Sequence, residues 1–218
     1  MSVAARYARL VEEIAAELRA CGREEESVTI VGVAKRQPLD RVREAIEAGL
    51  HDVAENRLQE AERAYPQLPP VRKHFIGRIQ TNKAKGIAAL FDLVQSVDRL
   101  DAGLALARAA AVAGRALPIL IQVNVSGTER YGCPPEEAPT LAQRLRAESS
   151  LCVEGVMAMG PFDADRAAVA AAFETAAKTL ARVGGNTLSI GMSNDWREAI
   201  RAGSTMVRIG TALFGERI

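Results

Sequence analysis

Short apolar runs alternate with longer amphipathic segments along most of the chain, and this alternation predicts an α/β fold. The run Val28–Ala34 is mostly apolar and rich in β-branched residues, as is typical of a fully buried strand. Pro38 prevents its extension, and Leu39–Ala48 then carries apolar residues at helical spacing until Gly49 ends the helix. The segment is therefore predicted to form one strand followed by one helix.

The same order recurs along the rest of the chain. Further strands are predicted at His51–Glu55, His74–Gly77, Phe91–Val97, Leu117–Asn124, Val153–Met157, Thr187–Gly191 and Thr205–Ile209. Helices are predicted at Ser2–Ala20, Asn56–Arg63, Gln80–Leu90, Arg99–Ala113, Pro134–Glu148, Ala164–Val183 and Asp195–Arg201. Strands that alternate with helices pair in parallel. Eight such units in 218 residues, the last helix nearly absent, predict a single (β/α)8 TIM barrel over residues 1–218, with a doubly wound open sheet as the alternative.

Composition narrows the classes of partner. A net charge of +1 and an aromatic content of 4% argue against a nucleic-acid-binding surface. No apolar run is long enough to cross a bilayer, and Glu12, Glu13 and Glu17 in the first helix are unlike a targeting segment. Three widely spaced cysteines and only two histidines suggest neither a disulfide framework nor a metal site. We therefore expect a cytoplasmic protein that contacts neither nucleic acid nor membrane.

Lys35 is the first candidate for chemistry because it follows the first predicted strand directly. The carboxyl ends of parallel strands are where α/β proteins place their sites. A lysine held against an apolar floor loses hydration, its pKa falls, and its amine can form a Schiff base with an aldehyde. The alternative is a solvated lysine that caps the strand.

The loops around the last two strands are candidates for an anion site. Barrels often bind phosphate at backbone N–H groups of the loops that follow strands seven and eight. Ser193 and Asn194 lie in the first of these loops, and Gly210 and Thr211 lie in the second. Helix capping and a glycine turn remain the alternative. A reactive lysine that faces a phosphate site indicates a ligand with an aldehyde and a phosphate, and pyridoxal 5′-phosphate has both.

Arg208, near the end of the last predicted strand, adds a permanent cation to this region. Facing a pyridine nitrogen, it would keep that nitrogen unprotonated and weaken the electron sink of the cofactor. Facing solvent, it would be an ordinary charge at the end of a strand.

Several strings resemble one known family. They are Val31–Pro38, Glu55–Glu60, His74–Lys83, Gln122–Ser126, Gly155–Met157, Leu188–Ser193 and Ala199–Gly215. Together they resemble the pyridoxal phosphate homeostasis protein family, across essentially the whole chain. The resemblance implies an alanine-racemase-like barrel of fold type III, without the second β domain of the racemases.

The resemblance also implies roles for particular residues. It makes Lys35 the Schiff-base residue, places Arg208 near the pyridine nitrogen, and gives phosphate contacts to Ser193, Ser204, Gly210 and Thr211. It places Asn56, His74 and Met192 around the pocket. The sequence departs from the family pattern at Ala54, at Lys73 and in the shorter loop containing Arg130 and Tyr131, where a family lysine is missing.

The function implied is intracellular homeostasis of pyridoxal phosphate, with the cofactor stored and delivered to apo forms of pyridoxal-phosphate enzymes. We expect a monomer without catalytic activity. A racemase needs an acid or base on each face of the substrate carbon, and beside Lys35 only Tyr131 is a candidate. A low-activity amino-acid racemase is the alternative, and a barrel for another phosphorylated metabolite is a third hypothesis.

Overall fold

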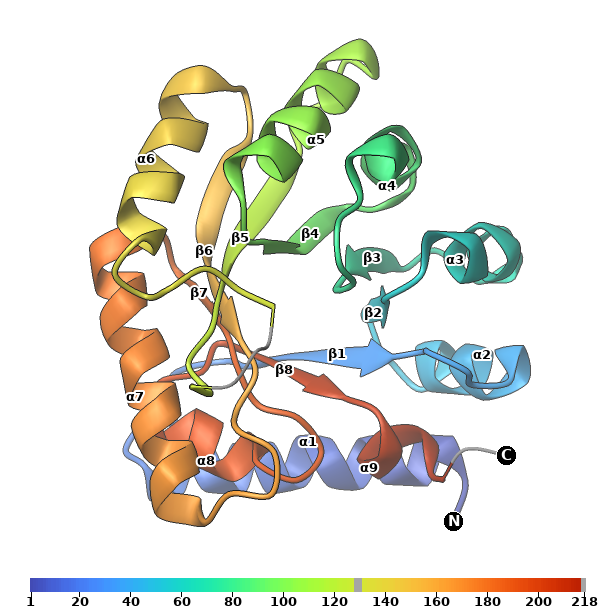
Figure 1. Ribbon diagram of the computed structural model, residues 1–218. Coiled ribbons are helices and arrows are strands. Elements are labelled where there is room, and N and C mark those ends of the chain that lie inside the picture. Colours follow the sequence, from blue (N-terminus) through green and yellow to red (C-terminus); the bar gives the residue numbers. More distant parts are fainter. Residues whose placement is uncertain (128–130, 217–218) are drawn as a thin grey trace.

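Eight parallel strands close into a barrel in the computed structural model, which describes residues 1–127 and 131–216. Each strand pairs with the next along the chain, and β8 (Met206–Ile209) pairs with β1 (Thr29–Val33) to complete the ring. Helices surround the strands in Figure 1. The predicted TIM barrel is confirmed, and the alternative of an open sheet is wrong.

The remaining elements follow the predicted order. The other strands are β2 (Asp52–Glu55), β3 (Arg72–Phe75), β4 (Leu93–Val97), β5 (Pro118–Val123), β6 (Cys152–Ala158) and β7 (Thr187–Ser189). The α-helices are α1 (Val3–Ala20), α2 (Leu39–Glu47), α3 (Leu58–Ala64), α4 (Ala84–Leu90), α5 (Leu100–Val112), α6 (Ala138–Glu148), α7 (Arg166–Val183), α8 (Trp196–Arg201) and α9 (Thr211–Phe214). Two 3₁₀ turns, Tyr65–Gln67 and Thr81–Lys83, precede β3 and α4.

The third strand begins two residues earlier than the sequence predicts. Arg72 and Lys73 pair in register with Asp52 and Val53, although both side chains are charged. A strand is held by backbone hydrogen bonds, which do not require apolar side chains. The predicted boundary, at His74, followed the apolar pattern and so missed the charged start of the strand.

Helix α1 compensates for the very short α9. It packs against α2, α8 and α9 on the outside of the barrel, where a full eighth helix would otherwise lie. Glu13 pairs with Arg197 at 2.7 Å and Glu17 with Arg201 at 2.7 Å, and both pairs join α1 to α8. Exposed pairs of this kind contribute little energy, so the buried apolar residues of α1, Leu10, Ile14 and Leu18, supply most of the attachment.

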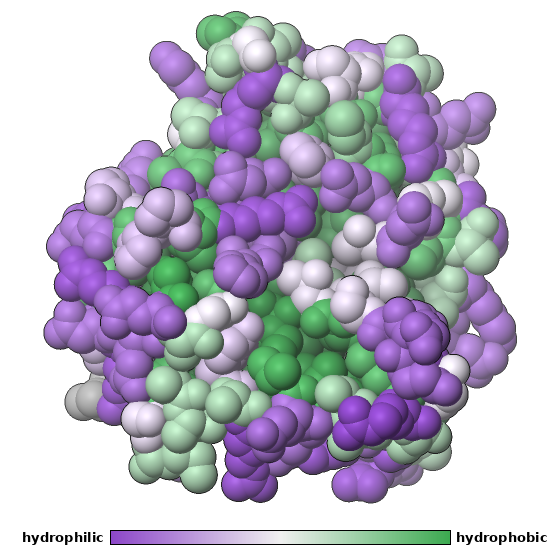
Figure 2. All heavy atoms as spheres, turned by 180° about the vertical axis from the view of Figure 1, so that it is seen from behind, coloured by the Kyte–Doolittle hydropathy of each residue, from purple (hydrophilic) through white to green (hydrophobic). Residues whose placement is uncertain are grey.

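The apolar core has two parts. One lies between the sheet and the helices, and the other fills the barrel interior with Val31, Ala54, Leu93, Leu120, Met157 and Met206. Seen from behind in Figure 2, polar residues cover much of the surface, and apolar residues show mainly in hollows between them. Within the described ranges, no helix combines the length and apolar character that crossing a bilayer requires.

Candidate functional site

A pocket of about 640 Å³ opens at the carboxyl ends of β1, β6, β7 and β8. Val33 and Arg208 line it from the strands, and the loops after β6, β7 and β8 supply the other walls. Five of the residues predicted from the sequence line this one pocket: Met192, Ser193, Arg208, Gly210 and Thr211. Lys35, Asn56, His74 and Ser204 are outside that lining.

Lys35 lies in a tight turn directly after β1. The N–H of Gln37 donates to the carbonyl oxygen of Ala34 at 2.9 Å, and Arg36 adopts a positive φ of 56°. A non-glycine residue with this φ is held by its surroundings at some cost in energy, and such residues are frequent at functional sites. Val33, two residues before Lys35, lines the pocket, so the half-buried Lys35 follows the β1 residue that forms part of the pocket wall.

Backbone N–H groups converge on Ser193. Its Oγ accepts hydrogen bonds from the N–H groups of Gly210 and Ala212, each at 3.2 Å. Both groups belong to the start of α9, where N–H groups have no partner within the helix. A Cβ built on Gly210 would meet only the Cβ of Val33, at 3.9 Å, so space remains beside this backbone. The arrangement can accept an anion that bonds to the same N–H groups.

Arg208 and Asp195 are opposite charges in the same pocket. Burial lowers the pKa of Arg208 to about 10, and the nearby Asp195 charge opposes this shift, so the guanidinium stays charged at neutral pH. Burial raises the pKa of Asp195, although an N–H bond from Met192 and the charge of Arg208 both act to lower it. The pocket therefore holds a fixed cation beside a carboxyl group that burial makes harder to ionise.

The orientation of Arg208 is fixed by three hydrogen bonds. Its Nη1 donates to the carbonyl oxygen of Ser189 at 2.7 Å and to Ser189 Oγ at 2.6 Å, and its Nη2 donates to the carbonyl oxygen of Ala158 at 2.8 Å. A guanidinium has five N–H groups. Two of them therefore find no acceptor among the described residues and are free to bind a ligand in the pocket.

Asn56 follows Glu55, the last residue of β2, on the strand that pairs with β1. The Oε2 atom of Glu55 accepts hydrogen bonds from the N–H groups of Asn56 and Arg57, at 2.8 and 3.2 Å. Burial raises the pKa of Glu55, while these two bonds and the charge of Lys35 lower it. The side-chain Oδ1 of Asn56 is buried and has no hydrogen-bond partner among the described residues. A buried acceptor without a partner is costly, so a donor from a ligand would stabilise this amide.

His74 lies inside the barrel. It has no exposed surface, and its two ring nitrogens contact Asp52 Oδ1 at 2.8 Å and Gln95 Nε2 at 2.7 Å. The structure therefore gives His74 two partners within the chain and no place in the pocket wall.

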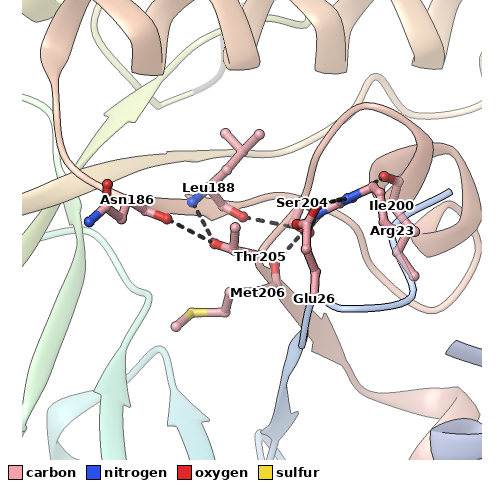
Figure 3. A network of polar contacts seen from close by, with 8 residues as sticks. All are labelled: Arg23, Glu26, Asn186, Leu188, Ile200, Ser204, Thr205 and Met206. Atoms are coloured by element: carbon pink, nitrogen blue, oxygen red, sulfur yellow. Dashed lines mark hydrogen bonds and ion pairs between the residues drawn. The ribbon is translucent and has the colours of Figure 1, made fainter. Parts of the chain in front are cut away.

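Ser204 lies at the opposite end of the barrel from the pocket, before the first residue of β8. Its hydroxyl lies within hydrogen-bond distance of the carbonyl oxygens of Leu188, Ile190 and Met206, at 3.3, 2.9 and 3.0 Å. Figure 3 shows Ser204 in a polar network with Thr205 and Arg23 that ties the amino ends of β7 and β8 together. We therefore remove Ser204 from the candidate phosphate site.

One wall of the pocket was not predicted from the sequence. Gly160, Pro161 and Phe162 follow β6 and line the pocket, as does Asp195, which the sequence predicted only as the first residue of a helix. Tyr131 is 54% exposed, and the guanidinium of Arg78 lies 4.8 Å from the centre of its ring. Arg130, named above in the same loop, is outside the described residues.

Comparisons with known proteins agree with this geometry. Residues 11–218 match the family model of the alanine racemase N-terminal domain. The chain is 42% identical over 221 residues to the pyridoxal phosphate homeostasis protein of Pseudomonas aeruginosa, covering 99% of this chain and 96% of that protein. The chain belongs to this family. Its homologue of the same name in Escherichia coli K12 is 34% identical, over 99% of this chain and 97% of that protein.

Solved structures of related proteins share the barrel. The structure of PipY from Synechococcus elongatus with pyridoxal phosphate bound has a TM-score of 0.81 and 31% identity, and covers 94% of this chain and all of that one. An alanine racemase from Clostridium difficile has a TM-score of 0.73 at 16% identity, over 94% of this chain and 56% of that one. At 16% identity, the similarity to the alanine racemase shows only that the two proteins share a fold.

Proposed function

We propose that this protein binds pyridoxal 5′-phosphate at the carboxyl end of its barrel and serves the intracellular homeostasis of that cofactor. The observation that carries the proposal is the PipY structure, a relative at 31% identity that has pyridoxal phosphate bound. Relatives from Pseudomonas aeruginosa and Escherichia coli are named pyridoxal phosphate homeostasis proteins.

The residues present fit the cofactor. The N–H groups at Gly210 and Ala212, with the hydroxyl of Ser193 and that of Thr211, suit the phosphate. The free N–H groups of Arg208 suit an acceptor nitrogen in the ring, and Met192 lines the same pocket. The unpartnered Oδ1 of Asn56 would gain a donor from the ligand. We keep His74 in the proposed site although it does not line the pocket, because hydrogen bonds through Gln95 and Ser189 connect it to Arg208.

Lys35 supplies the covalent contact in this proposal. When bound, pyridoxal phosphate offers an aldehyde that condenses with a primary amine and releases one water molecule. Lys35 can present that amine from a turn whose backbone is fixed by the bond between Ala34 and Gln37. Among the described residues no ion pair involves the Lys35 amine, although its charge acts on the nearby carboxyl group of Glu55. Arg208 stays charged and would disfavour protonation of a ring nitrogen held opposite it.

We propose storage and delivery of the cofactor to apo enzymes, by a monomer in the cytoplasm, in preference to catalysis. Racemisation needs a second acid or base on the face of the substrate opposite Lys35. Tyr131 was the one candidate from the sequence, and its ring is more than half exposed and stacks with Arg78. A low-activity racemase remains the second candidate, and it predicts turnover of small amino acids that is lost in Lys35→Ala.

The test is the absorption spectrum of the purified protein with pyridoxal phosphate, before and after borohydride reduction, followed by mass mapping of the modified lysine. We expect a visible band that reduction abolishes and a label on Lys35. Lys35→Ala should fold and lack both, whereas Lys85→Ala, a change on the exposed face of α4, should behave as the wild type. A folded Lys35→Ala protein that still carries a reducible label would overturn the proposal.

A further inference from the structure

A chain of hydrogen bonds runs through the barrel interior from the pocket to the opposite end. Arg208 Nη1 contacts Ser189 Oγ at 2.6 Å, and Ser189 Oγ contacts Gln95 Oε1 at 2.7 Å. Gln95 Nε2 contacts His74 Nδ1 at 2.7 Å, and His74 Nε2 contacts Asp52 Oδ1 at 2.8 Å. Asp52 lines a separate hollow at the amino ends of β1 and β2, so the chain spans the length of the barrel.

Each hydrogen bond of this chain is donated in the direction from Arg208 toward Asp52, and Arg208 determines this direction. A guanidinium can only donate, so Ser189 Oγ accepts from Arg208 and its own proton is left for Gln95. Gln95 therefore presents its oxygen to Ser189. Its NH₂ group is left for His74 and for the sulfur of Met206, which lies 3.3 Å away.

The same logic fixes the tautomer of His74. Because Gln95 donates to Nδ1, that nitrogen carries a lone pair, and the ring proton is on Nε2, where Asp52 accepts it. A flipped Gln95 would place its oxygen against the Met206 sulfur, where no donor exists. The observed orientation gives the donors of Ser189, Gln95 and His74 an acceptor each, which is the arrangement a buried network needs to be stable.

We propose that His74 is a positioning residue that, through Gln95 and Ser189, holds the Arg208 guanidinium toward the ring of the bound cofactor, with Asp52 fixing the His74 tautomer. This inference rests on the proposed function, because it assigns Arg208 the ring nitrogen. The buried chain explains how a charged side chain keeps one orientation beside an apolar residue such as Val31, with which Arg208 pairs in register. It also leaves the two remaining N–H groups of Arg208 for the ligand.

The first measurement needs no cofactor. We propose NMR of the wild-type protein labelled with ¹⁵N in histidine and arginine, with His51→Gln to assign the one other histidine. We expect the neutral Nε2–H tautomer for His74 and slowly exchanging N–H signals for the Arg208 guanidinium. A proton on Nδ1 of His74, or a mixture of tautomers, would overturn the direction of the chain.

The second measurement compares His74→Leu with His74→Gln. A glutamine side chain can accept from Gln95 and donate to Asp52, whereas leucine can do neither. We expect His74→Leu to bind pyridoxal phosphate about tenfold more weakly, to shift its visible band, and to lose the protected Arg208 signals. His74→Gln should restore all three toward the wild type.

Leu93→Ala is the matched control. Leu93 pairs in register with His74 and lies in the same interior layer, but its side chain forms no part of the hydrogen-bond chain. It should destabilise the protein while leaving the visible band and the Arg208 signals unchanged. If His74→Leu matches Leu93→Ala in these readouts, the positioning role is wrong and His74 is only part of the core.

Failure of the proposed function would be recognised separately. In that case the wild-type protein would show no visible band with pyridoxal phosphate, whatever happens in the variants. The Arg208 signals would still decide the positioning role, because they should be lost in His74→Leu and retained in His74→Gln without any ligand. Equal Arg208 signals in both variants would overturn it.

Discussion

The loop after β3 crosses the end of β2 so closely that a methyl group on Gly77 would overlap the backbone carbonyl of Asn56. The carbonyl of Gly77 in turn accepts a hydrogen bond from Ser96 at 2.6 Å. Gly77 is thus held between the end of β2 and β4, and the absence of its side chain lets the backbone of Asn56 lie directly against it. Glycine is required at position 77 because there is no room for a Cβ atom, and not because the backbone adopts a positive φ.

Gly77→Ala should therefore be strongly destabilising. The new methyl group meets backbone atoms, which cannot rotate away as a side chain can, so we expect a loss of about 3 kcal/mol in the free energy of unfolding. Gly22→Ala is the control: Gly22 has a φ of 67° but open space around it, and should lose only about 1 kcal/mol. Urea denaturation of both variants measures the difference, and equal losses would contradict the steric explanation.

The barrel could be predicted from the sequence because the pattern that produces it, a strand followed by a helix, recurs along the chain. Each strand is a short apolar run that ends before a helix with its own apolar stripe, and parallel pairing follows from that order. The error at β3 arose where Arg72 and Lys73 pair through their backbone alone. Boundaries depend on hydrogen bonds that side-chain polarity does not report.

The interior chain could not be predicted from the sequence. Gln95 and Ser96 are consecutive in β4 and both are buried, so alternation does not say which of them faces the barrel axis. His74 resembled a pocket residue because its string matched the family pattern. Its true surroundings depend on Asp52 and Gln95, which lie on two neighbouring strands.

The placement of Ser204 shows that a sequence segment can match a family although some of its residues lie far from the site. Ser204 is only four residues before Arg208 in the sequence, and both belong to one string of the resemblance. A strand rises about 3.3 Å per residue, so Arg208 lies about 7 Å along β8 from its first residue, Met206, and Ser204 precedes that strand by two further residues. Two residues that are close in sequence can therefore lie on opposite sides of the barrel layer, one before the strand and the other near its carboxyl end.

Ser193→Ala and Ser204→Ala should separate these two serines by experiment. Each variant loses hydrogen bonds of a serine hydroxyl, and each should lose about 1 kcal/mol in the free energy of unfolding. Only Ser193→Ala should also weaken pyridoxal phosphate binding, by about tenfold, because Ser193 lies at the N–H groups of Gly210 and Ala212. Spectroscopic titration measures this, and weaker binding by Ser204→Ala alone would return Ser204 to the site.

The cysteines should differ in reactivity. Burial raises the pKa of Cys133 to about 12, and its Sγ lies 3.4 Å from the carbonyl oxygen of Gln122. Since the thiolate is the reactive form, Cys133 should resist iodoacetamide in the folded protein at mildly alkaline pH. Cys152 is exposed and should react first. Mass mapping of labelled peptides checks the order, and Cys133 should become reactive in urea; fast labelling of Cys133 in the folded state would contradict its burial.

Glu55→Gln should change how stability depends on pH. Burial raises the pKa of Glu55 above its ordinary value of 4.5, so the folded protein keeps this proton to a higher pH than the unfolded chain does. The stability that the protonated group contributes is therefore complete below the pKa of the unfolded chain and is lost as pH rises through the raised pKa of the folded state. Glutamine keeps an oxygen that can accept from Asn56 and Arg57 but carries no charge.

The free energy of unfolding of Glu55→Gln should thus increase relative to the wild type as the pH rises from 4.5 toward neutrality. Urea denaturation across this interval measures the difference, and Glu24→Gln, on an exposed turn, is the control and should show no such trend. The opposite slope, with the variant losing stability relative to the wild type as pH rises, would mean that the bonds from Asn56 and Arg57 and the charge of Lys35 outweigh burial. Ionised Glu55 would then stabilise the turn at the end of β2, directly beside the candidate cofactor site.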